Sequence, residues 1–315
     1  MGEKTKIAWC DATWNPWRGC TKIAAGCVNC YAEADFDKRR HVAVWGPQGT
    51  RVVTEEANWR KPLAWNRAAE KAGVRRRVFC ASLADVFEDH HALYAPREAL
   101  VRLIRATPDL DWLLLTKRPE NVTRLWLQAT ITSETLEAFD AGQSLDLPQS
   151  NVWTGTSVEN QAAADLRIPE LLKVPAVVRF LSIEPLLGPI DLHLNASERP
   201  DWVIVGGESG PRARPCNVAW IRSIVAQCRG AAIPVFVTQL GSRIIGQYYG
   251  DGPLGDAMSS HPYSVVSSAG HAIPADTRPP PGALIRGRLE DGKGGDPAEW
   301  PEDLRVREFP GLENR

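Results

Sequence analysis

The sequence predicts an α/β protein built on a partial (β/α)6-type barrel of parallel strands with a C-terminal extension. Short apolar runs rich in Val, Leu, Ile and Trp recur about every 25 to 40 residues, as buried parallel strands do. Amphipathic helical patterns lie between these runs, and a polar or Gly/Pro-rich segment follows each one. Alternation of this kind is typical of βα units.

Six apolar runs are the expected strands, and a further first strand is expected around residues 12–15. The six runs are residues 78–82, 112–116, 152–156, 177–181, 202–206 and 235–238. Two of the intervening segments show a clear helical period: residues 96–105 and residues 219–228 each place Leu, Ile or Val side chains on one face. The Trp residues that begin several runs are expected in the core.

The pattern changes after the last run. We assign residues 1–241 to the barrel and residues 242–290, rich in Gly, Ser and Pro, to a loop or lid insertion. Residues 291–315 are charged, and they are expected to pack on the barrel through Trp300 and Phe309.

Composition limits the class of protein. The chain has 315 residues, 37 Lys and Arg against 38 Asp and Glu, and a net charge of −1. Such a balance gives no global field for nucleic acid, although a local basic face remains open. With no signal peptide and no membrane-length apolar run, we expect a cytoplasmic protein without membrane association. Its seven cysteines are then reduced, which favours a metal site over disulfides.

Three cysteines form a compact motif. Cys20, Cys27 and Cys30 are separated by six and two residues in a loop that contains Gly19 and Gly26. Three interpretations stay open: a structural zinc site completed by Cys10 or a distant His, a [4Fe–4S] cluster with one open iron, and three unligated thiols.

The polar segments after the strands supply the other candidates. Carboxyl ends of parallel strands are where α/β barrels place their active sites. Helix caps and turns explain part of this pattern, because they also favour Ser, Asp and Asn. The side chains singled out there are Ser82, Asp85, Lys117, Ser157, Glu159, Glu184 and Glu208.

A three-cysteine loop ahead of βα units resembles the radical S-adenosylmethionine (SAM) enzymes. Their usual motif is C-x3-C-x2-C, and this chain matches the second gap but not the first. A closer resemblance is to the phage Gp37/Gp68-like family, which is itself similar to radical SAM proteins. The stretches that carry it are residues 12–16, 19–20, 26–33, 115–119, 151–160, 179–188, 202–210, Gly241 and 294–310. Thr238 stands where that family often has Lys.

The resemblance implies roles for the candidate residues. Cys20, Cys27 and Cys30 would hold the [4Fe–4S] cluster. The cofactor-binding set for SAM would be Ser82 and Asp85 at its ammonium and Ser157, Glu159 and Glu184 at its ribose. Lys117 or Arg118 would meet its carboxylate. Lys117 and Glu208 are the candidate catalytic residues, with Glu208 near the substrate.

The resulting hypothesis is a radical SAM-type enzyme that needs an external electron donor. Its substrate is unknown, and the resemblance favours a nucleobase, nucleotide or nucleic acid. Two alternatives remain: a zinc-stabilised noncatalytic nucleic-acid-binding protein, and an iron–sulfur scaffold that does not cleave SAM.

Overall fold

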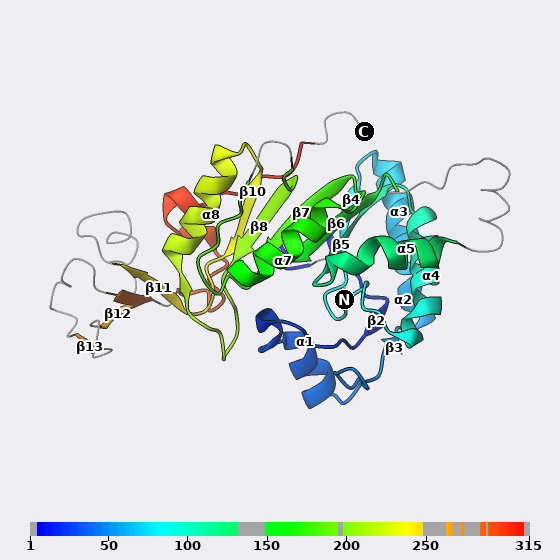
Figure 1. The fold of residues 1–315 in the computed structure, drawn as a ribbon, viewed down its shortest axis with the longest axis horizontal. Helices are drawn as coiled ribbons and strands as arrows, with labels where there is room; N and C mark the ends of the chain where they lie inside the picture. The colour runs from blue at the N-terminus through cyan, green and yellow to red at the C-terminus, as the bar shows by residue number, and fades with distance from the viewer. Residues whose placement is uncertain are drawn as a thin grey trace. The chain divides into compact units, whose positions relative to one another are not determined.

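A computed structural model describes residues 5–131, 149–194, 198–247, 263–266, 272–273, 284–287 and 289–311 (Figure 1). The chain divides into two compact units. The first comprises Met1–Ser157 and Asp165–Leu181, and the second comprises Val158–Ala164 and Ser182–Arg315. We describe each unit by itself.

The main sheet has seven strands whose spatial order follows the order of the chain. They are β1 (Ala12–Thr13), β4 (Arg76–Cys80), β5 (Leu110–Thr116), β6 (Val152–Ser157), β7 (Val178–Ile183), β8 (Trp202–Gly206) and β10 (Val235–Gln239). β1, β4, β5 and β6 pair in parallel, as do β8 and β10. Sequential parallel strands in an open sheet confirm the predicted partial-barrel α/β class.

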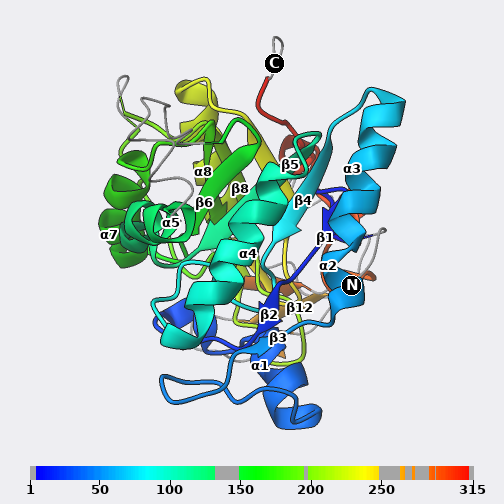
Figure 2. The ribbon, with the colours of Figure 1, turned by 90° about the vertical axis from the view of Figure 1, so that its right-hand side faces the viewer.

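Helices cover the strands of the first unit. They are α2 (Glu56–Trp59), α3 (Lys61–Ala72), α4 (Tyr94–Arg105) and α5 (Val122–Thr130), while α7 (Gln161–Leu172) runs across the boundary between the units. Figure 2 shows α3 and α4 alongside β4 and β5. α3 begins with Pro62 in its first turn and ends at Gly73, which has a φ of 63°. Both residues are typical of these positions.

The N-terminal segment adds small elements to the first unit. β2 (Trp17–Arg18) pairs antiparallel with β3 (Val52–Val53). Between them lie the turn η1 (Ala25–Cys27), the short helix α1 (Tyr31–Glu33) and the π-helical turn η2 (Ala34–Arg39). This part of the chain lies beyond β2 and β3, at the lower edge of both views (Figures 1 and 2).

Tryptophans form much of the core of the first unit. Trp14 and Trp112 are fully buried, and their rings meet edge to face with centroids 5.5 Å apart. Each indole nitrogen donates a hydrogen bond, Trp14 to the carbonyl of Asn58 at 2.9 Å and Trp112 to Oγ1 of Thr107 at 3.0 Å. Burial of these two indoles therefore leaves neither N–H without a hydrogen bond. The prediction that strand-initial Trp residues are core is confirmed.

The second unit contains α8 (Val218–Gly230) and a second sheet. Its order is β13 (Ala272–Ile273), β12 (Tyr263–Val266), β14 (Leu284–Gly287), β11 (Ile244–Gln247) and β9 (Cys216–Asn217). Four of these strands, β11, β12, β13 and β14, lie within residues 242–290, the segment that we predicted as a loop or lid insertion. Strands of two to four residues are too short to show a period in the sequence. The rest of residues 248–288 lies outside the described residues.

The C-terminal segment lies against the last strands of the second unit. The indole of Trp202 donates to the carbonyl of Glu308 at 2.8 Å, and the ring of Phe309 lies 5.2 Å from that of Phe236. Trp300 is buried and donates to the carbonyl of Gly294 at 3.0 Å. Two short turns, η5 (Pro297–Glu299) and η6 (Glu302–Leu304), precede this contact.

Within the parts of the chain that the structure describes, no helix has both the length and the apolar character needed to cross a membrane.

The tryptophan core generates a stability prediction. Trp112→Ala removes a fully buried indole, and we expect the free energy of unfolding to fall by about 3–5 kcal/mol. Urea unfolding followed by circular dichroism measures it. Val74→Ala is the control, because Val74 is 65% exposed and should change the value by no more than about 0.5 kcal/mol. Equal losses in the two variants would contradict the assigned core.

Candidate functional site

The cysteine loop follows β2 and lies against the segment that follows β4. The backbone N–H of Gly19 donates to the carbonyl of Leu83 at 3.3 Å, and the hydroxyl of Tyr31 donates to the carbonyl of Ser82 at 2.6 Å. The side-chain amide of Asn15, which is fully buried, donates to the hydroxyl of Ser82 at 3.0 Å. Ser82, the first candidate residue after β4, therefore helps to hold the cysteine loop in place.

Gly19 is needed where the loop begins. Its φ is +109°, which L side chains rarely adopt, and a Cβ there would lie 2.3 Å from the carbonyl oxygen of Thr50. The glycine lets the chain turn toward Cys20 while it passes close to the backbone of Thr50, just before β3.

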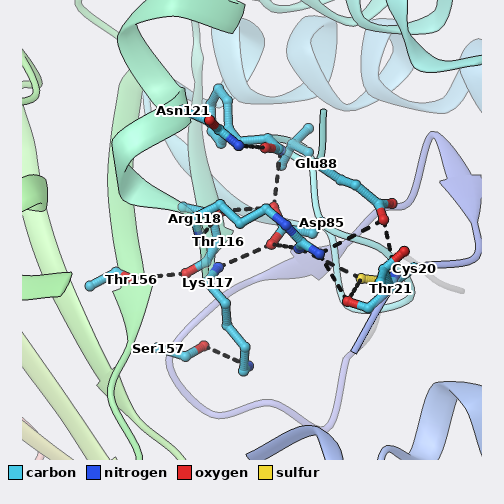
Figure 3. Close-up of polar contacts among 12 residues, drawn as sticks. Cys20, Thr21, Asp85, Glu88, Thr116, Lys117, Arg118, Asn121, Thr156 and Ser157 are labelled. Carbon is cyan, nitrogen blue, oxygen red and sulfur yellow. Dashed lines mark hydrogen bonds and ion pairs between the residues drawn. The ribbon is translucent and has the colours of Figure 1, made fainter. Parts of the chain in front are cut away.

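Asp85 joins the ends of β4 and β5 (Figure 3). It is 5% exposed. Its Oδ1 accepts from the hydroxyl of Thr116 at 2.6 Å and the N–H of Phe87 at 3.0 Å. Its Oδ2 accepts from the N–H of Lys117 at 3.0 Å and the guanidinium of Arg118 at 2.8 Å. The carboxylate accepts four hydrogen bonds, and it thereby holds the segment after β4 against the end of β5.

Arg118 links Asp85 to the cysteine loop. Its guanidinium donates to the carbonyl of Thr21 at 2.9 Å and lies 4.0 Å from the sulfur of Cys20 (Figure 3). Glu88 accepts from the N–H of Thr21 at 3.0 Å, and Arg51 donates to the hydroxyl of the same residue at 2.9 Å. Backbone and side chain of Thr21 are thus held from three directions, which fixes the position of Cys20.

Burial, more than neighbouring charge, sets the protonation of the thiols. Burial, together with the negative charge of Asp85, raises the pKa of Cys20 to about 12, although Arg118 opposes the shift. Burial also raises the pKa of Cys30, and the positive charge of Lys117 opposes that shift. Both thiols are therefore protonated near neutral pH, and a metal centre that binds them must displace their protons.

Lys117 directly follows the last residue of β5. Its ammonium donates to the hydroxyl of Ser157 at 3.0 Å, at the end of β6 (Figure 3). The carbonyl of Ser157 in turn accepts from Arg167 at 2.8 Å. The structure therefore brings together Ser82, Asp85, Lys117, Ser157 and the cysteine loop in the first unit.

The three predicted glutamates belong to the second unit, where backbone hydrogen bonds bring their segments together. The N–H of Leu187 donates to the carbonyl of Glu159 at 2.9 Å, and that of Leu186 to the carbonyl of Gly206 at 2.9 Å. A Cβ on Gly207 would lie 2.3 Å from the carbonyl oxygen of Leu240, so glycine is required where the segment after β8 meets the end of β10.

Two of these glutamates accept hydrogen bonds from neighbouring side chains. Arg214 donates to Glu208 from its backbone at 2.7 Å and from its guanidinium at 2.8 Å. Hydrogen bonding to Glu208, with the negative charge of Glu159, raises the pKa of Arg214. Thr238 donates to Glu184 at 2.7 Å. The hydroxyl at position 238 therefore gives Glu184 a neutral partner where a lysine would give an ionic one.

The fit of the cysteines to a metal centre is mixed. Cys20, Cys27 and Cys30 are free thiols of intermediate exposure in one loop, and three soft sulfur donors suit an iron–sulfur cluster. Cys10 is buried, and its thiol contacts the carbonyl of Ile7 at 3.8 Å. Across the described ranges, no set of three or more His, Cys, Asp or Glu side chains is placed to hold a metal ion. Three thiols are suitable ligands for an iron–sulfur cluster, but in this structure they do not converge on one point.

Sequence reasoning missed Arg51, Glu88 and Thr21. The ion pair between Arg51 and Glu88 joins residues 37 positions apart, and no local pattern marks such a pair. The polar segment after β4 was the available signal, because it placed Glu88 near the candidate site.

The buried pair generates a second prediction. Arg51 and Glu88 lie 2.6 Å apart with side chains 0% and 5% exposed. Arg51→Met leaves a buried carboxylate short of a cation, and we expect a loss of about 3–5 kcal/mol in the free energy of unfolding. Denaturant unfolding measures it. Arg60→Met is the matched control, because Arg60 and Glu56 form a pair whose side chains are 72% and 78% exposed. Its loss should stay below about 1 kcal/mol; a larger loss than in Arg51→Met would refute the assignment.

Comparisons with known proteins give one match. No curated protein and no solved structure matches the chain. A family model described as a protein of unknown function (DUF5131) matches residues 4–271, which is most of the chain. The chain therefore belongs to the DUF5131 family, a family of unknown function.

Proposed function

We propose that this chain is a radical SAM-type enzyme whose cysteine loop holds a [4Fe–4S] cluster. One observation carries the proposal: a loop with three free thiols is tied to the segments that follow parallel strands β4 and β5. That edge of the sheet is where α/β barrels perform chemistry. The resemblance to the phage Gp37/Gp68-like family and to radical SAM proteins supports the same assignment.

Cys20, Cys27 and Cys30 would hold the cluster. When bound, the cluster would supply the electron that cleaves SAM and starts radical chemistry on a substrate. Arg118 and Glu88 fix the backbone of Thr21 and so hold the first cysteine in place.

The remaining candidate residues would bind and orient SAM and the substrate. The ammonium of Lys117, held by the hydroxyl of Ser157, is proposed to meet the carboxylate of SAM, because Arg118 is already paired with Asp85. Asp85 orients Lys117 through its backbone N–H rather than by touching the cofactor. In the second unit, Glu159 and Glu184 are proposed for the ribose and Glu208 for the substrate. We keep a nucleobase, nucleotide or nucleic acid as the proposed substrate class.

The decisive experiment is anaerobic reconstitution with iron and sulfide, followed by reduction and addition of SAM. We expect about four irons per chain and formation of 5′-deoxyadenosine, measured by chromatography. Cys27→Ala should lose both. Cys228→Ala, which changes a buried thiol in α8, should keep both.

The other outcomes separate the alternatives. Stoichiometric zinc without iron uptake would refute the proposal in favour of a zinc-stabilised binding protein. A stable cluster that never cleaves SAM would refute it in favour of an iron–sulfur scaffold.

Lys117 gives a further prediction. Lys117→Met removes one charge-assisted hydrogen bond, and we expect SAM to bind roughly 10- to 100-fold more weakly, with iron content unchanged. Equilibrium dialysis of radiolabelled SAM measures the affinity. Lys117→Arg should recover part of it because the charge is kept. Unchanged affinity in Lys117→Met would exclude this residue from the cofactor site.

A further inference from the structure

Three arginines of the second unit belong to two segments that follow strand ends of the main sheet. Arg212 and Arg214 lie in the turn of residues 209–214, which comes directly after Glu208, and Arg243 directly precedes β11. We call Arg212, Arg214 and Arg243 the arginine group. Open α/β sheets bind ligands beyond the carboxyl ends of their strands, and both segments leave the sheet there, after β8 and β10.

Hydrogen bonds hold the two segments of the arginine group against each other. The N–H of Ser242 donates to the carbonyl of Glu208 at 2.9 Å, and the N–H of Gly210 donates to the hydroxyl of Ser242 at 3.0 Å. The guanidinium of Arg243 donates to the carbonyl of Ala213 at 3.5 Å. Arg243 therefore lies against the turn that carries the other two arginines.

The two carboxylates that act on this group are buried. Glu208 is 8% exposed and accepts from the backbone N–H, the Nε and the Nη2 of Arg214 at 2.7, 2.8 and 2.6 Å. Glu159, whose charge also acts on Arg214, is 1% exposed. Arg212 and Arg243 are exposed, and among the described residues no carboxylate pairs with Arg243. Exposed cations thus stand above an acid that is already engaged.

Other acids nearby are few. Residues 209–217 and 239–247 contain no Asp or Glu. The hydroxyl of Ser242 also donates to the carbonyl of Gly292, in a segment with three acidic residues. Two of the three, Asp291 and Asp296, accept backbone N–H groups of that same segment at 2.6 and 2.9 Å, and the third, Glu290, is exposed. The exposed guanidinium groups therefore outnumber the exposed carboxylates around the turn.

A phosphate monoester is the ligand that this arrangement fits. A guanidinium group binds two phosphate oxygens through parallel hydrogen bonds. A monoester carries close to two negative charges at neutral pH, which matches two exposed cations. Ser209, also exposed in the turn, adds a hydroxyl donor. A carboxylate, with one charge and two oxygens, would satisfy a single guanidinium.

A nucleic-acid strand fits less well than a single phosphate. Nucleic acids are held by cations that neutralise several successive phosphates. Here the cations belong to one turn and the segment beside it, and the chain has a net charge of −1. The arrangement therefore suits one phosphate group on a small molecule.

We infer that the arginine group binds the phosphate of a mononucleotide, which is the substrate of the reaction proposed above. The inference rests on the proposed function, because that function places the substrate at Glu208, the residue before the turn. Arg212 and Arg243 would contact the phosphate, while Arg214 positions Glu208. Of the three proposed substrate classes, this selects the nucleotide.

The test measures binding to the full chain by isothermal titration calorimetry. The probes are the common ribo- and deoxyribonucleoside 5′-monophosphates, each compared with its nucleoside. We expect at least one monophosphate to bind, and its nucleoside to bind at least about tenfold more weakly. The inference is overturned if no monophosphate binds, or if each nucleoside binds as well as its monophosphate.

Two variants test the arginines themselves. Arg212→Met and Arg243→Met should each weaken monophosphate binding about tenfold or more, because each removes a charge-assisted contact. Arg243 also contacts the backbone of the turn, so Arg212→Met decides the matter if Arg243→Met does not fold. Unchanged affinity in Arg212→Met would exclude the turn as a phosphate site.

A matched control lies in the same unit. Arg229 is an exposed arginine in the last turn of α8, outside the arginine group. Arg229→Met removes the same charge from the chain and should bind the monophosphate as the unaltered chain does. Equal weakening by this control would show a general charge effect and overturn the inference.

Inorganic phosphate and a single-stranded oligonucleotide identify the source of the phosphate. Inorganic phosphate that binds as tightly as the monophosphate, with the same dependence on Arg212, would overturn the nucleotide assignment in favour of a free phosphate ion. Tighter binding of the oligonucleotide, lost in the same variants, would overturn it in favour of nucleic acid.

These titrations need no iron, so the inference and the proposed function can fail separately. Monophosphate binding that depends on Arg212, in a chain that takes up no iron, would support the phosphate site and refute the proposed reaction. Iron uptake and SAM cleavage without monophosphate binding would refute the phosphate site alone.

Discussion

The buried ion pair between Asp85 and Arg118 is the interaction on which the candidate site depends. Two charges removed from water are tolerable only when both are paired and hydrogen-bonded. Asp85 meets that requirement with donors from the segment after β4 and from the end of β5, and Arg118 meets it with Thr21 in the cysteine loop. One pair therefore links two strand ends and the loop, and the loss of either partner would leave the other charge buried.

This constraint acts unequally on the three cysteines. Cys20 is next to Thr21, whose backbone and hydroxyl are held by Glu88, Arg118 and Arg51. Cys27 ends η1 and Cys30 precedes α1, which the hydroxyl of Tyr31 ties to the carbonyl of Ser82. The first sulfur thus has a fixed position, and the six-residue gap separates it from the close pair. Any common metal centre would have to be completed by the pair approaching the fixed sulfur.

Most of the fold could be predicted from the sequence, and only part of the site. Buried parallel strands leave continuous apolar runs, so β4 to β8 and β10 were recognisable, and Trp112 was rightly placed in the core. The second sheet was missed because strands of two to four residues pair across long separations. The segments after the strands indicated Asp85 and Lys117, but the ion pair of Arg51 and Glu88 left no local signal. Periodicity reports burial, whereas pairing of distant charges is a property of the folded chain.

The near-zero net charge is a second sequence property that does not describe the surface of the folded chain. A sum over the chain treats each ionised side chain as equally visible to a partner, and the structure shows that they are not. Asp85 and Glu88 are almost completely buried, while Lys38 and Arg39 stand in solvent. An approaching macromolecule responds to the exposed charges within a Debye length and hardly to paired charges beneath them. The formal charge of −1 therefore does not fix the charge that any one face of the folded chain presents to a partner.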